Sequence, residues 1–245
     1  MTNDSHFGFK TVDRNVKKSL VDDVFSAVSD NYDVMNDVMS FGLHRLWKDY
    51  FVNQLNLKHS DKILDLAAGT GDITKRMHKK LSKAGQLIIA DYNLPMLKQG
   101  HDRLLNEGIL HQTCVVDGHH LPFKDNEYDH IVISFGLRNM ADHETVLNSC
   151  LKTLKPGGCL SVLEFSHPEH ETFSKIYDWY SFNLIPQFGQ WFAQSKDSYQ
   201  YLVESIRMHP KAPELQATFD RTGFKQTSYE FLTGGIVAIH RGIKA

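Results

Sequence analysis

The chain has 245 residues, of which 41% are apolar and 23% are charged, and its formal net charge is −2. This composition is that of a globular protein long enough to bury a large core, and the near-zero charge argues against a nucleic-acid partner. No apolar run approaches the roughly 20 residues that span a bilayer. The first residues carry no signal for secretion or organelle import, so we expect a cytoplasmic protein.

The first 57 residues are predicted to be helical. Apolar side chains recur every four positions, the spacing of one helix face, at Val16, Leu20, Val24 and Val28. A second apolar and aromatic helical stretch runs from Met35 past Trp47. We interpret residues 1–57 as a helical lid on a catalytic domain formed by residues 58–245, and the alternative is simple packing of the N-terminal helices.

From residue 58 onward, short apolar runs alternate with segments of helix length. The five runs are residues 62–66, 86–91, 113–117, 128–134 and 159–164. The helical segments are residues 72–84, 93–107 and 141–154. Runs buried on both faces that alternate with helices indicate a parallel sheet covered on both sides. Residues 166–208 look like an insertion, and the chain closes with a helix near 212–222 and strands at 224–231 and 235–241. The predicted fold is therefore α/β, Rossmann-like, with a mainly parallel seven-stranded sheet.

Polar residues close the predicted strands at the edge where parallel sheets bind their ligands. These residues are Asp91, Asp117, Ser134 and Glu164, with Asp65 just inside the end of the first strand. The turn after that strand contains Gly69-Thr70-Gly71, whose glycines let the backbone approach a ligand closely. Asp91 follows Gly71 by 20 residues, the position from which a carboxylate accepts both hydroxyls of an adenosine ribose.

This turn favours S-adenosylmethionine over a dinucleotide. Thr74 replaces the third glycine of the dinucleotide fingerprint, and Asp72 at the helix start would repel a pyrophosphate. S-adenosylmethionine has no phosphate and carries a sulfonium and an ammonium group, which suit Asp65 and Asp72. We expect the pair Asp117-Gly118 to hold the adenine and Ser134 to lie near the methionine end.

These features resemble class I S-adenosylmethionine-dependent methyltransferases, and longer strings narrow the resemblance to the ubiquinone/menaquinone biosynthesis C-methyltransferases. The strings, spread over nearly the whole chain, are Tyr32-Asp-Val-Met-Asn36, Ser134-Phe-Gly-Leu-Arg-Asn139, Leu163-Glu-Phe-Ser166, Glu204-Ser-Ile-Arg-Met-His-Pro210 and Ala238-Ile-His-Arg-Gly242. One departure is Ala68, where the family usually has a glycine. By this resemblance the cofactor positions are Thr70, Asp91, Asp117, Gly118 and Ser134.

The resemblance implies methyl transfer to a ring carbon of a polyprenylated quinol, either demethylmenaquinol or a methoxy-benzoquinol. No metal is needed, because a sulfonium methyl is already electrophilic. The ring carbon instead becomes nucleophilic when the neighbouring hydroxyl loses its proton. Arg138 and Asn139 follow the strand that ends at Ser134, and we expect them to bind the quinolate oxygen. The alternative for Arg138 is a structural ion pair with Asp142 or another carboxylate.

The insertion is unusually aromatic, with 8 aromatic side chains among residues 173–192 in a chain that is 11% aromatic. Either this face packs on the sheet, or it forms an apolar wall for the polyprenyl tail with an edge that touches the inner face of the membrane weakly. Two other functions stay open: an O- or N-methyltransferase, and a non-catalytic scaffold subunit of a quinone-biosynthesis complex. A homodimer is also compatible with the sequence.

Overall fold

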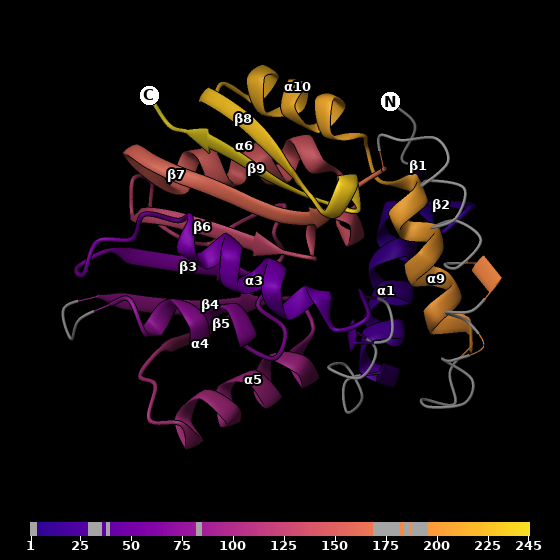
Figure 1. The fold of residues 1–245 in the computed structure, drawn as a ribbon, viewed down its shortest axis with the longest axis horizontal. Helices are drawn as coiled ribbons and strands as arrows, with labels where there is room; N and C mark the ends of the chain where they lie inside the picture. The colour runs from indigo at the N-terminus through magenta and orange to yellow at the C-terminus, as the bar shows by residue number, and fades with distance from the viewer. Residues whose placement is uncertain are drawn as a thin grey trace.

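The computed structural model describes residues 4–28, 36–37, 40–81, 85–168, 182–183, 187 and 196–245. Its centre is a seven-stranded sheet with the order β5-β4-β3-β6-β7-β9-β8 (Figure 1). The strands are β3 (Lys62–Leu66), β4 (Gln86–Asp91), β5 (Gln112–Val115), β6 (Tyr128–Ser134), β7 (Leu154–Phe165), β8 (Lys225–Leu232) and β9 (Val237–Ile243). Neighbours from β5 to β7 are parallel, whereas β9 runs antiparallel to both β7 and β8.

This sheet confirms the predicted fold class, with small shifts at the strand ends. β7 begins at Leu154 rather than Cys159, because Leu154 pairs with Tyr128 before the register shifts toward His130. β5 ends at Val115, so Asp117 lies in the loop beyond it.

Helices cover both faces of the sheet because its buried residues alternate between two cores. Ile63 belongs to the core under α3 (Leu43–Asn53), α4 (Asp72–His78) and α5 (Leu94–Asn106). Leu64 belongs to the opposite core, under α6 (His143–Thr153) and α10 (Ala212–Thr222). Figure 1 shows these two helical layers on either side of the strands. The sheet is therefore accessible to ligands only at its ends.

The prediction of helix throughout the first 57 residues was wrong at the N-terminus. β1 (Asp4–Phe7) and β2 (Lys10–Asp13) form an antiparallel hairpin, which turns at Gly8 with φ of 58°. Each strand has four residues and no apolar run, so hydrophobic periodicity could not reveal it. The predicted spacing of Val16, Leu20, Val24 and Val28 lies in α1 (Arg14–Val28), and Trp47 of the second predicted helical stretch lies in α3.

The hairpin, α1 and α9 (Lys196–Met208) gather beyond the end of the sheet at which the parallel strands finish (Figure 1). Most of the predicted aromatic insertion, including Trp179 and Tyr180, lies outside the described residues, as does Tyr32. Within the described ranges, none of the helices has both the length and the apolarity to cross a membrane.

Candidate functional site

A cavity that is open to solvent lies at the carboxyl ends of the parallel strands, against one face of α1, and its volume of about 820 Å³ includes the solvent at its mouth. Six of the ten predicted site residues line it: Gly69, Asp91, Asp117, Gly118, Ser134 and Asn139. The other four, Asp65, Thr70, Gly71 and Arg138, are not among its lining residues. Sequence reasoning missed the lining residues of α1, which are Lys18, Val21, Asp22 and Phe25.

The glycine turn forms one wall of the cavity, and Asp91 holds it in place. The backbone N–H of Gly69 donates to Asp91 Oδ2 at 2.8 Å, and that of Asn93 donates to Oδ1 at 2.9 Å. A Cβ on Gly100 would come within 2.6 Å of the Gly69 carbonyl oxygen, so this glycine lets α5 pack directly against the turn. Burial raises the pKa of Asp91, although these backbone hydrogen bonds oppose the rise.

Asp117 faces the cavity from the loop after β5 and is paired with the helix above it. Lys18 of α1 forms an ion pair with Asp117 Oδ2, and the His119 backbone N–H donates to Oδ1 at 3.0 Å. Burial alone would raise the pKa of Asp117, but the hydrogen bonds from Lys18 and His119 lower it to about 2. Asp117 is therefore an anion that can accept further hydrogen bonds.

Ser134 contributes a buried hydroxyl for which the described residues offer no hydrogen-bond partner. It lies at the end of β6 and lines the cavity together with Asp91 and Asp117. A buried hydroxyl without a partner is costly unless a ligand satisfies it. Two carboxylates and such a hydroxyl fit a ligand that has ribose hydroxyls, an adenine amino group and positive charge, and S-adenosylmethionine has all three.

Asp65 supports the glycine turn from behind. Thr74 Oγ1 donates to Asp65 Oδ2 at 2.6 Å, which ties β3 to α4, and Asp65 is only 1% exposed. Burial raises the pKa of Asp65 to about 7. Asp65 therefore acts on the shape of the turn rather than as part of the cavity wall.

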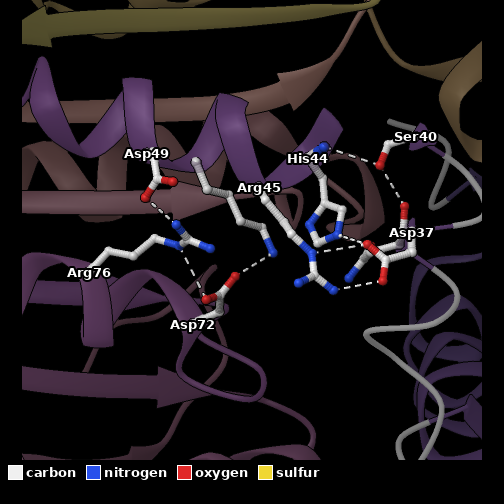
Figure 2. Close-up of polar contacts among 9 residues, drawn as sticks. Asp37, Ser40, His44, Arg45, Asp49, Asp72 and Arg76 are labelled. Atoms are coloured by element: carbon white, nitrogen blue, oxygen red, sulfur yellow. Dashed lines mark hydrogen bonds and ion pairs between the residues drawn. The ribbon is translucent and has the colours of Figure 1, made fainter. Parts of the chain in front are cut away.

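Asp72 begins α4 and is already engaged by two cations. Lys48 Nζ of α3 lies 2.9 Å from Asp72 Oδ2, and Arg76 Nε lies 3.2 Å from Oδ1. Figure 2 shows Arg76 bridging Asp72 to Asp49 of α3. Burial would raise the pKa of Asp72, but Lys48 and Arg76 lower it to about 2. The expected pairing of Asp72 with the cofactor's positive charge is replaced by this internal network.

A second group of polar contacts lies at the start of α3. Asp37 accepts hydrogen bonds from Arg45 Nη2 at 2.7 Å and pairs with His44 Nε2 at 2.9 Å. The backbone N–H of His44 donates to Ser40 Oγ at 3.1 Å (Figure 2). These contacts fix the first turn of α3, whose preceding residue, Gly42, offers no side-chain cap.

Arg138 has the partner that the sequence left as an alternative. Its Nη1 lies 2.7 Å from Glu164 Oε1 and donates to the Phe135 carbonyl at 2.6 Å, and its side chain is 3% exposed. Glu164, at 1% exposure, also accepts from the backbone N–H groups of Arg138 and Phe165. In this structure the guanidinium holds the turn after β6 and is not among the residues that line the cavity, as the ion-pair alternative predicted, and its direct contact with a quinolate stays a prediction.

Asn139, by contrast, lines the cavity at the end of the short 3₁₀ helix η2 (Leu137–Asn139). Its side-chain oxygen Oδ1 accepts a hydrogen bond from the hydroxyl of Tyr201, on α9, at 3.0 Å. Sequence reasoning missed Tyr201 because it lies 62 residues further along the chain and belongs to no cofactor motif. Across the described part of the chain, no group of His, Cys, Asp or Glu side chains is arranged to hold a metal ion.

Comparison with known protein families and with curated proteins identifies the same family. The model of the ubiE/COQ5 methyltransferase family matches residues 13–244. The ubiquinone/menaquinone biosynthesis C-methyltransferase UbiE of Pseudoalteromonas translucida is 50% identical over 98% of this chain and 96% of its own length. The protein of the same name from Idiomarina loihiensis is 48% identical over 97% and 96%, respectively.

Solved structures are similar in fold at much lower identity. An S-adenosylmethionine-dependent methyltransferase from Aquifex aeolicus superimposes with a TM-score of 0.61 at 13% identity, over 96% of this chain and all of that one. The phosphoethanolamine N-methyltransferase 2 of Haemonchus contortus, in complex with S-adenosyl-L-methionine, has a TM-score of 0.60 at 13% identity. The superposition covers 81% of this chain and 52% of the Haemonchus chain.

Proposed function

Because this chain belongs to the ubiE/COQ5 methyltransferase family, we propose that it methylates a ring carbon of a polyprenylated quinol, with S-adenosylmethionine as the methyl donor. The product is a precursor of ubiquinone, of menaquinone or of both. The observation that carries this proposal is a single cavity in which the acceptors Asp91, Asp117 and Ser134 and the amide of Asn139 converge against α1.

The donor half of the site consists of the glycine turn and the residues that follow three strands. Asp91 binds the ribose hydroxyls with lone pairs that Gly69 and Asn93 leave free, and the Asp117-Gly118 loop binds the adenine. Ser134 gives its unpartnered hydroxyl to the methionine end. The bound donor supplies an electrophilic methyl group on a sulfonium. Thr70 and Gly71 shape the turn, and Asp65 stabilises it through Thr74.

The acceptor half depends on Asn139. Its amide N–H groups donate to the quinol oxygen next to the reacting carbon, and they stabilise the charge that develops as the hydroxyl ionises. Arg138 contributes indirectly, because its pairing with Glu164 fixes the turn that carries Asn139. Glu164 also neutralises the guanidinium, so we assign the direct contact to Asn139.

The N-terminal hairpin and α1 serve as the lid over this site. Lys18 and Asp22 reach from α1 to both sides of the cavity, to Asp117 and Asn93. A lid that closes over both substrates excludes water and aligns the ring carbon with the methyl group. The aromatic segment 173–192 supplies the wall for the polyprenyl tail and a weak contact with the membrane surface. The partners are the polyprenylated quinol and either a second copy of the chain or a quinone-biosynthesis complex.

Turnover of the purified protein with methyl-labelled S-adenosylmethionine and paired tail-less benzoquinol and demethylnaphthoquinol analogues tests the proposal. We expect a label on a ring carbon, identified by NMR of the extracted product. An O-methyl product would support the alternative acceptor class, and donor binding without transfer would indicate a scaffold subunit. The Asp91→Ala variant is the control: loss of two charge-assisted hydrogen bonds should weaken donor binding at least tenfold, since each contributes roughly 1.5–3 kcal/mol.

A further inference from the structure

The amide of Asn139 can help or hinder the reaction depending on which way it points. Its two ends are nearly the same size, but the nitrogen end donates hydrogen bonds whereas the oxygen end accepts them. Only the nitrogen end can stabilise a quinolate oxygen, and the oxygen end would repel it. The orientation of the amide therefore depends on which neighbouring group forms a hydrogen bond with it.

In this structure Tyr201 forms that hydrogen bond. Its hydroxyl donates to Asn139 Oδ1 at 3.0 Å, which draws the oxygen end toward α9 and leaves the nitrogen end for the cavity that Asn139 lines. Tyr201 is only 3% exposed, so water does not compete for this bond. Burial raises the pKa of Tyr201, and its hydroxyl therefore keeps the proton that it donates.

Tyr201 is itself held by the N-terminal hairpin. Its ring stacks on Phe7 with centroids 4.2 Å apart and an interplanar angle of 17°. One turn further along α9, Glu204 accepts a hydrogen bond from the backbone N–H of Phe9 at 3.1 Å. A Cβ on Gly8 would come within 2.1 Å of Glu204 Oε2, so the hairpin fits closely against α9. The position of the tyrosine ring is thus fixed from two sides.

We propose that Tyr201 is a positioning residue for the methyl transfer: it orients the Asn139 amide so that its nitrogen faces the substrate. This inference rests on the proposed function of Asn139 as the donor to the quinol oxygen. It predicts that the hydroxyl of Tyr201 matters for turnover only while Asn139 is present.

The test is a double-mutant cycle on the full chain with a tail-less quinol analogue and S-adenosylmethionine. Tyr201→Phe removes one oxygen and keeps the stacked ring, so we expect kcat to fall roughly tenfold, the effect of one lost hydrogen bond. The KM for S-adenosylmethionine should stay within about twofold of wild type because donor binding does not use Tyr201. Asn139→Ala should lose at least as much, and Tyr201→Phe should cost nothing further in that background.

Tyr199→Phe is the matched control. Tyr199 lies on the same helix, is fully buried, and has no hydroxyl partner among the described residues, so its variant should keep the kcat of wild type. The kcat–pH profile separates positioning from a general structural role. Its apparent pKa should shift upward equally in Tyr201→Phe and Asn139→Ala, because the quinol then ionises with less help.

Three outcomes would overturn the inference. Wild-type kcat in Tyr201→Phe together with a large loss in Asn139→Ala would remove Tyr201 and leave the proposed function intact. Losses that multiply in the double variant would show that the hydroxyl acts independently of Asn139. Wild-type kcat in Asn139→Ala would overturn both the role of Asn139 and that of Tyr201.

Discussion

The two N-terminal helices α1 and α3 attach to the sheet in different ways. α3 buries Trp47, Phe51 and Val52 in the core at 5%, 0% and 2% exposure, and its Lys48 pairs with Asp72 in a largely buried site. α1 contributes Phe25 to the same core, at 9% exposure, and depends more on polar contacts across the cavity. Those contacts are Arg14–Asp142 at 2.8 Å, Lys18–Asp117, and Asn93 Nδ2 to Asp22 Oδ1 at 2.6 Å.

These different attachments indicate where the lid ends. Separating α3 from the sheet would expose a buried aromatic cluster and a buried ion pair. Separating α1 would expose one buried ring, Phe25, with the partly buried Val21 and Val24, and would exchange partly exposed polar contacts for water. This contrast favours a lid that is shorter than the predicted residues 1–57. We propose that the mobile part is the hairpin with α1, and that α3 belongs to the catalytic domain.

The strongest pH dependence of stability should come from Asp65, in contrast to Asp117, which pairs with α1. Burial raises the pKa of Asp65, behind the glycine turn, to about 7 from an ordinary value of 3.8. Its contribution to stability is therefore full below about pH 4 and is lost as pH rises through about 7. Relative to Asp65→Asn, the wild-type free energy of unfolding should fall by on the order of 4 kcal/mol between pH 4 and pH 8, measured by urea denaturation.

Asp117, which pairs with α1, should show the opposite sign. Burial opposes the shift, but Lys18 and His119 lower the pKa of Asp117 to about 2. Its contribution is present above about pH 4 and is lost as pH falls through about 2. An identical pH dependence for Asp65→Asn and Asp117→Asn would contradict the opposite pKa shifts assigned to these two carboxyl groups.

The next effect is on the anchor of α3. Lys48→Met leaves Asp72 with Arg76 alone in a largely buried site, so the free energy of unfolding should fall by about 3 kcal/mol. Lys75→Met is the matched control, because its pair with Glu107 is about one-third exposed at each end and should contribute less than about 1 kcal/mol. Equal losses in thermal or chemical unfolding would mean that the Lys48–Asp72 pair is no anchor.

The smallest effect on stability belongs to α1. Lys18→Met removes a partly exposed ion pair and should lower the free energy of unfolding by less than about 1 kcal/mol. It should nevertheless speed dissociation of S-adenosylmethionine several-fold in stopped-flow experiments, because the closed lid loses one contact. Lys10→Met, on the exposed hairpin edge, should leave that rate unchanged. A dissociation rate that is the same in all three proteins would argue against α1 as a lid.

The sequence predicted the sheet well because each strand leaves a local signal. The apolar runs and the glycine turn define β3, β4 and β6 from residues that are close in the chain. The polar strand ends then identify Asp91 and Ser134, since parallel strands finish at the same edge. The hairpin carries no such signal, because the four residues of each strand lack both an apolar run and a strict alternation.

Long-range partners explain the rest of the difference. Arg138 is a candidate for substrate binding when read alone, but Ser134 pairs in register with Leu163, which brings Glu164 beside the turn after β6. That register cannot be derived from the motif itself. Tyr201 is a harder case, because its contact with Asn139 depends on how α9 packs against the end of the sheet.

Amide hydrogen exchange with and without S-adenosylmethionine tests α1 as the lid, since it compares α1 and α3 in one experiment. We expect the donor to slow exchange strongly in residues 14–28 and in the glycine turn, and to leave residues 43–53 nearly unchanged because they are already protected. Equal protection of both helices, or no change in α1 at a saturating donor concentration, would contradict the assignment of α1 as the lid over the methyl-donor site.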